Sequence, residues 1–82
     1  MNRQHEVESL DFEGDWMTLR VDGQVYRLPL AQVSDRLANA SEADRKIYRI
    51  APSGYGIHWT TLDEDLSING LLKLAAIQSQ AS

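Results

Sequence analysis

The sequence predicts an α+β fold with the element order βββαββα, and three observations lead to this prediction. Polar and apolar residues alternate over the neighbouring stretches 7–12 and 15–21, as they do in half-buried strands. Asp22-Gly23 follows, and this dipeptide is typical of a two-residue hairpin turn. After Pro29 the spacing of apolar residues lengthens to three or four, which indicates an amphipathic helix.

The first three strands are expected to form an antiparallel meander over residues 6–30. The Asp22-Gly23 turn places Met17 opposite Leu28, and a turn at Glu13-Gly14 places Leu10 opposite Met17. A slip of one residue would move every side chain to the other face, so the agreement of both turns on one apolar face supports this register.

One helix is expected over residues 30–40, where its apolar stripe would cover the meander. Ser41 resembles the cap of a short helical turn through Arg45. Two further short strands are expected at 47–51 and 57–60, joined by the loop Pro52–Gly56. In the second of these strands, Ile57 and Trp59 share a face and His58 takes the opposite one.

The C-terminal part is expected to be a turn followed by a helix. Asp63-Glu64-Asp65 is too acidic for a buried strand and too short for a helix, which predicts a turn. Ser67 is a suitable N-cap for the last helix. The buried stripe of that helix is expected to contain Ile68, Leu71, Leu72 and Ala75.

Length and composition indicate a single small domain over residues 1–82. The chain has no cysteine, which excludes disulfides, thiolate zinc sites and a cysteine nucleophile. Its net charge of −4 argues against direct nucleic-acid binding, which needs a positive surface. The polar N-terminus lacks the apolar core of a signal peptide, and no apolar run is long enough to span a membrane. A cytoplasmic protein without membrane association is therefore expected.

His58 and the acidic run suggest a metal site or a catalytic site, and each suggestion competes with a structural one. His58, Asp63, Glu64 and Asp65 offer metal ligands, but consecutive carboxylates diverge and their spacing fits neither a zinc nor a calcium site. A solvated acidic turn is the favoured interpretation, and no metal or cofactor is expected.

For catalysis, His58 would act as a general base oriented by Asp63 or Asp65, with Ser53 or Thr60 as the nucleophile. A structural histidine–carboxylate pair is favoured, since a domain of this size has little room for a pocket. The only other histidine, His5, is expected in a frayed N-terminus. Gly54-Tyr55-Gly56 leads into a strand and does not match a phosphate-binding loop.

Exposed aromatic and aliphatic side chains suggest a surface for a partner. Trp16 is expected on the outer face of the meander, and exposed tryptophans often anchor interfaces. Leu74 and Ile77 lie off the buried stripe of the last helix, where a partner or additional core contact would cover them. The candidate interaction surface contains Trp16, Tyr55, His58, Asp63, Glu64, Asp65, Leu74 and Ile77.

Several motifs resemble a bacterial family, domain of unknown function number 2442. They are GYGIHW at 54–59, followed by LDEDLS and GLL. The segment Leu37–Ser41, which leads through a short acidic helix to Tyr48-Arg49-Ile50, and the Asp22-Gly23 hairpin also resemble the family. Members often carry proline where this chain has Thr60. The resemblance implies a small α+β domain, sometimes fused to a C-terminal helix-turn-helix segment. It also implies a gene beside that of another small protein, in an arrangement resembling toxin–antitoxin modules. It implies no catalytic residues.

The expected function is a non-enzymatic interaction domain, antitoxin-like, that binds a protein partner or itself. The alternative is a transcription-regulatory module that acts through DNA as an oligomer or with a partner. Because the sequence ends at Ser82 without a helix-turn-helix segment, we do not expect the isolated chain to bind DNA directly. The third hypothesis is a metal-binding or catalytic site at His58, Asp63 and Asp65.

Overall fold

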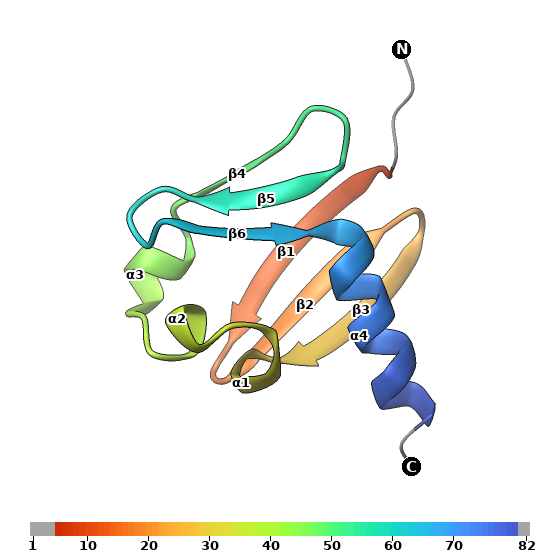
Figure 1. Ribbon diagram of the computed structural model, residues 1–82, viewed down its shortest axis with the longest axis horizontal. Helices are drawn as coiled ribbons and strands as arrows, with labels where there is room; N and C mark the ends of the chain where they lie inside the picture. Colours follow the sequence, from red (N-terminus) through yellow and green to blue (C-terminus); the bar gives the residue numbers. More distant parts are fainter. Residues whose placement is uncertain (1–4, 81–82) are drawn as a thin grey trace.

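The computed structural model describes residues 5–80, which form two three-stranded antiparallel sheets around one hydrophobic core (Figure 1). The first sheet is the expected meander, with strands β1 (Val7–Glu13), β2 (Trp16–Val21) and β3 (Gln24–Pro29). The second sheet contains β4 (Tyr48–Ile50), β5 (Gly56–Trp59) and β6 (Glu64–Ser67). Single-turn helices link the two sheets: α1 (Leu30–Val33), α2 (Asp35–Ala38) and α3 (Glu42–Arg45). The last helix, α4 (Ile68–Gln80), follows β6 and runs beside β3. The predicted α+β class and meander are confirmed.

The β2–β3 hairpin has the predicted turn and register. Asp22 and Gly23 both have positive φ values, 52° and 81°, as a type I′ turn requires. Met17 lies opposite Leu28, and Leu19 lies opposite Tyr26. Met17, Leu19 and Leu28 are all fully buried, so the predicted apolar face is the core face.

The β1–β2 turn differs from the prediction. The central residues are Gly14-Asp15, and Glu13 pairs with Trp16 as the last residue of β1. The positive φ of Gly14, 59°, explains this position, because a type II′ turn favours glycine at its first central residue. Leu10 therefore lies opposite Leu19 and not opposite Met17. The register differs by two residues, which leaves every side chain on the predicted face.

The predicted helix over residues 30–40 is wrong, because Ser34 divides it into α1 and α2. Ser34 has an extended backbone, with φ −167° and ψ 125°, and its side-chain oxygen accepts a hydrogen bond from the Leu37 N–H. A serine in this position ends one helix and caps the next. Leu30 and Leu37 are nevertheless buried, so the stripe still covers the meander.

The predicted turn at residues 63–65 is also wrong, and a sixth strand takes its place. The turn lies at residues 60–63, where Asp63 has a φ of 51°, and β6 begins at Glu64. Asp65 pairs with His58 on β5, and Leu66 pairs with Ile57. Asp65 is compatible with this strand because its side chain lies on the solvated face of an antiparallel sheet.

The start of α4 follows the prediction. The Ser67 hydroxyl accepts a hydrogen bond from the Gly70 N–H at 2.9 Å, which satisfies one of the unpaired donors in the first turn. Ile68 and Leu71 are buried, while Leu72 and Ala75 are partly buried against the same core. Within residues 5–80, none of the helices is long and apolar enough to cross a membrane.

Trp59 joins the two sheets in the core. Its side chain is fully buried, with the Phe12 ring edge-on at 6.5 Å and the Tyr48 ring at 6.0 Å between centroids. The Tyr48 hydroxyl donates to the Leu10 carbonyl at 3.2 Å. Aromatic pairs in these geometries stabilise a core beyond the area that they bury.

Arg45 at the end of α3 is a charged residue buried beside this core, with only 7% of its surface exposed. Its guanidinium donates three hydrogen bonds, to the carbonyls of Leu37 (2.8 Å), Ala38 (2.9 Å) and Gly14 (2.9 Å). The Arg45 carbonyl accepts a hydrogen bond from Nε1 of Trp59 at 2.9 Å. One residue thus connects the meander turn, the end of α2 and the second sheet.

Replacing Arg45 by methionine should lower the free energy of unfolding by about 3 kcal/mol, because three carbonyls would lose their donor in a poorly hydrated site. Arg45→Lys should recover little, since an ammonium cannot reproduce the planar geometry of the guanidinium. Urea denaturation followed by circular dichroism measures both. The exposed Arg20 provides the control, and Arg20→Met should change stability by less than about 0.5 kcal/mol. Equal unfolding midpoints for Arg45→Met and Arg20→Met would contradict the role of Arg45.

Candidate functional site

The outer face of the second sheet carries a cross-strand row of polar side chains. Arg49 on β4 pairs with His58 on β5, and His58 pairs with Asp65 on β6. Because side chains alternate along a strand, burial of Ile57 and Trp59 places His58 on the opposite, outer face. This arrangement agrees with the predicted orientation of His58.

Small residues form the next row and create a groove. This row contains Ala51, Gly56 and Ser67, each two residues along its strand from a member of the polar row. The Ala51 N–H donates to the Gly56 carbonyl at 2.9 Å, and Gly56 pairs with Ser67. A side chain at Gly56 would collide with β6, since its Cβ would lie 2.9 Å from the Leu66 carbonyl oxygen. Tyr55, 57% exposed, completes an open groove of about 550 Å³.

His58 and Asp65 form a hydrogen-bonded pair in the wall of this groove. His58 Nδ1 lies 2.6 Å from Asp65 Oδ1, and the two side chains are 43% and 77% exposed. Of the two carboxylates considered from the sequence, Asp65 is therefore the partner of His58. No hydroxyl within residues 5–80 hydrogen-bonds this imidazole, so neither Ser53 nor Thr60 forms the expected nucleophile–base contact.

The other two acids of the run lie elsewhere, so the three acids do not form the expected solvated turn. Glu64 is half-buried on the inner side of β6 and accepts a hydrogen bond from the Ser34 hydroxyl at 2.5 Å. Asp63 is exposed in the preceding turn, and its carbonyl accepts from Arg36 at 2.8 Å. Within the part of the chain that the structure describes, no three His, Asp or Glu side chains are placed to hold a metal ion.

Trp16 lies on the outer face of the meander, on a different sheet from the groove. Its side chain is 40% exposed, and the Arg27 guanidinium lies over the indole ring, 4.6 Å from its centroid. Arg27 also lies 3.8 Å from Glu13. The indole is thus exposed as predicted, with a cation–π contact over one face.

The two aliphatic residues predicted to lie off the buried stripe of the last helix differ in solvent exposure. Ile77 is 64% exposed on α4. Leu74 is only partly exposed and packs against the core, so the additional core contact considered from the sequence is correct for this residue.

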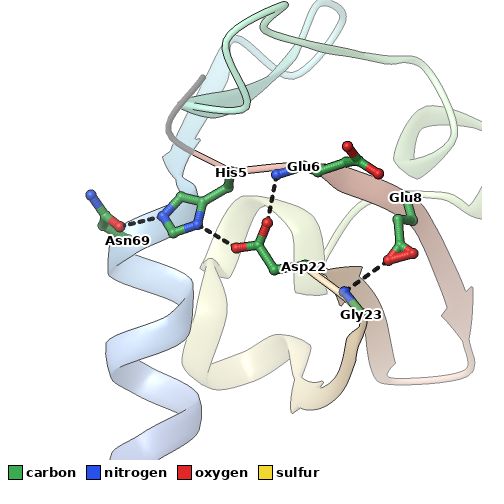
Figure 2. A network of polar contacts seen from close by, with 6 residues as sticks. All are labelled: His5, Glu6, Glu8, Asp22, Gly23 and Asn69. Carbon is green, nitrogen blue, oxygen red and sulfur yellow. Dashed lines mark hydrogen bonds and ion pairs between the residues drawn. The ribbon is translucent and has the colours of Figure 1, made fainter. Parts of the chain in front are cut away.

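A polar network around His5 was missed in the sequence, where this residue was expected to fray (Figure 2). Nδ1 of His5 lies 2.8 Å from Asp22 Oδ2, and Nε2 lies 2.7 Å from Asn69 Oδ1. The other Asp22 oxygen accepts from the Glu6 N–H at 2.8 Å. His5 therefore ties the β2–β3 turn to the first turn of α4, and its side chain is only 18% exposed.

The sequence contains little that would identify this network. His5 and Asn69 are separated by 64 positions, and no periodicity relates contacts over such a distance. The only local signal is Asp22, because an aspartate in a tight turn often accepts hydrogen bonds from nearby backbone groups. Predicting the partner would have required the position of α4 beside the meander.

Comparison with known proteins gives the family of the chain. The family model described as "Protein of unknown function (DUF2442)" matches residues 7–76, which is most of the sequence. The chain belongs to the DUF2442 family. This DUF2442 chain is also similar to a solved protein of unknown function from Rhodospirillum rubrum ATCC 11170. The two share 25% sequence identity with a TM-score of 0.68, over 85% of this chain and 87% of the other. Comparison with curated proteins gives no match.

The His5 network of this DUF2442 domain shifts the pKa of two of its members. The hydrogen bonds of His5 to Asp22 and then to Asn69 raise its pKa above the usual 6.5. The backbone hydrogen bond from Glu6 and then the contact with His5 lower the pKa of Asp22 below the usual 3.8. Both shifts favour the charged pair, protonated His5 and ionised Asp22.

The network should therefore stabilise the DUF2442 domain in a defined pH range. The contribution of His5 to the free energy of unfolding should be complete below pH 6.5. It should disappear as the pH rises through the higher pKa that His5 has in the folded state. The contribution of Asp22 should disappear as the pH falls below 3.8. Urea denaturation at several pH values between 5 and 9 measures the free energy of unfolding of the wild type and of His5→Gln. We expect the difference between these two free energies to shrink toward high pH.

Asp22→Asn is the matched control for this titration. Asn-Gly is as suitable for the hairpin turn as Asp-Gly, so the variant removes the charge and retains the turn. It should reduce the pH dependence that His5 causes. A constant difference between the wild type and His5→Gln over this pH range would show that proton binding at His5 is not linked to folding.

Proposed function

We propose that this DUF2442 domain is a small cytoplasmic, non-enzymatic interaction module that binds a protein partner through the outer face of β4–β6. The groove between the Arg49–His58–Asp65 row and Tyr55 is the observation that carries this proposal. In keeping with the arrangement that the family resemblance implies, the proposed partner is the small protein encoded beside it, and the domain is antitoxin-like.

The composition of the groove supports partner binding. Its floor of Ala51, Gly56 and Ser67 permits close approach, and Tyr55 offers an exposed aromatic ring with a hydroxyl at its end. Tyrosine and arginine are enriched among residues that contribute most to protein interfaces, and both line this groove. A groove between β3 and α4 also contains a tyrosine, an arginine and two alanines, but its Tyr26 is partly buried, whereas Tyr55 is exposed.

The same features give less support to an enzyme. His58 and Asp65 are a plausible acid–base pair in isolation, but both are substantially exposed in an open groove. Catalytic sites usually exclude water and contain a group that the base can activate. A partner surface needs neither property.

The regulatory alternative also has less support. Arg20 and Arg27 lie on the outer face of the meander, while Arg49 lies on the other sheet. Strand β1, which pairs with β2, adds the acidic residues Asp11 and Glu13 to this outer face. Glu13 lies 3.8 Å from Arg27. Binding of DNA through phosphates favours a continuous basic surface, which this distribution does not provide.

Co-expression of the tagged domain with the neighbouring small protein tests the proposal. We expect a complex that survives size-exclusion chromatography. Tyr55→Ala should weaken it at least tenfold, as removal of an aromatic interface anchor commonly does. Isothermal titration calorimetry of the separated proteins measures the change.

Val25→Ala is the matched control, because Val25 is 58% exposed on the meander, which is a different sheet from the one that forms the groove. It should leave the affinity unchanged. A domain that stays solitary in the presence of this protein would refute the proposed partner. Loss of binding in Val25→Ala but not in Tyr55→Ala would instead place the interface on the meander.

A further inference from the structure

The groove has opposite charges at its two ends. Arg49 on β4 is exposed, and among residues 5–80 its side chain has no hydrogen bond or ion pair. Asp65 on β6 contacts His58 through Oδ1 and is 77% exposed, which leaves its charge accessible. A complementary occupant therefore presents an acidic group over β4 and a basic group over β6.

The strand spacing sets the distance between the backbone positions that carry these two charges. Neighbouring strands lie about 4.8 Å apart, so the Cα atoms of Arg49 and Asp65 are separated by about 10 Å across β5. In a polyproline II helix, residues i and i+3 face the same side at a separation of about 9.3 Å. In a β-strand, same-side residues are separated by about 6.8 or 13.6 Å, and neither value fits.

The floor of the groove also suits a polyproline II segment. Proline-rich segments bind in grooves lined by aromatic residues, because their backbone is already ordered before binding. Tyr55 provides the aromatic ring, and the row Ala51–Gly56–Ser67 leaves space for the residues between the two charges.

The outer face of β4–β6 is small for the flat interface of a symmetric dimer, so an extended segment suits it better than a second folded copy. Three strands of about four residues present roughly 14 by 13 Å, or about 200 Å². A stable protein–protein interface needs about 800 Å² from each partner. A short segment that crosses three strands requires no more area than this face provides.

We propose that the groove binds a polyproline II segment of the partner in which an acidic and a basic residue are three positions apart. The acidic side chain pairs with Arg49 and the basic side chain with Asp65. The two residues between them cross Gly56 beside Tyr55. This inference rests on the proposed function, since it names the part of the partner that enters the groove.

Blocked synthetic peptides with the cores Glu-Pro-Pro-Lys, Glu-Pro-Pro-Glu, Lys-Pro-Pro-Lys and Glu-Pro-Lys test the charges and their spacing. Binding is measured at low ionic strength by chemical-shift titration of the whole labelled domain. The wild type should bind Glu-Pro-Pro-Lys roughly three- to tenfold more tightly than the other three. The reversed order, Lys-Pro-Pro-Glu, is no control, because a polyproline II segment can bind in either direction.

Charge-reversal variants give a second measurement. Arg49→Glu should prefer Lys-Pro-Pro-Lys, and Asp65→Lys should prefer Glu-Pro-Pro-Glu. Arg20→Glu changes the same charge on the other sheet and should retain the wild-type preference. Failure of every peptide to bind, or preferences that do not change in the variants, would overturn the inference. Concentration-dependent self-association that the groove variants abolish would also overturn it, in favour of a second copy.

These outcomes are separable from those of the proposed function. A complex with the neighbouring protein that is insensitive to the charge reversals would leave the function intact and overturn this occupant. Peptide preferences that follow the charges, without any complex, would refute the proposed partner and support the groove specificity.

Discussion

The contacts of Arg45 connect the parts of this fold that lie far apart in the sequence. Its guanidinium donates to carbonyls from the first turn of the meander and from the end of α2, and its own carbonyl accepts from Trp59. Arginine suits this position because its charge persists under all folding conditions and its planar donors reach several carbonyls at once. Single-turn helices such as α1–α3 are not stable alone, so such tertiary contacts must hold them.

The position of the groove follows from these contacts. The hydrogen bond of Trp59 to Arg45, together with its burial between Phe12 and Tyr48, fixes which face of β5 points into the core. The alternation of side chains then places His58 and Gly56 on the outer face, where β4 and β6 add Arg49 and Asp65. The chemistry of the surface is therefore set by the packing beneath it.

Local patterns were sufficient to predict the meander, the orientation of His58 and the cap of the last helix. Asp22-Gly23 determines a turn through its backbone preference alone, and Ser67 caps α4 through a contact three residues away. The error at the first turn changed which residues of β1 and β2 lie opposite each other. It did not change the face on which each side chain lies, because a shift of two residues preserves the alternation.

Long-range partners explain the predictions that failed. Ser34 interrupts the expected helix while its hydroxyl bonds Glu64, 30 positions away. The same contact makes an acidic residue acceptable on the inner side of β6, where the sequence predicted a turn. Arg45 looked like an ordinary basic residue at the end of a helical turn, because nothing local identifies the three carbonyls that it contacts. Two residues of the groove, Arg49 and Ser67, were missed because the groove residues come together only in the β4–β5–β6 register.

The proposed function depends most on the location of the binding surface. Chemical-shift mapping of the labelled domain with the unlabelled neighbouring protein tests this directly. We predict that the largest changes occur at the amides of Arg49, Gly56 and Asp65, with little change on the outer face of the meander. Changes centred on Thr18, Arg20 and Val25, with β4–β6 unaffected, would contradict the assignment of the groove as the functional site.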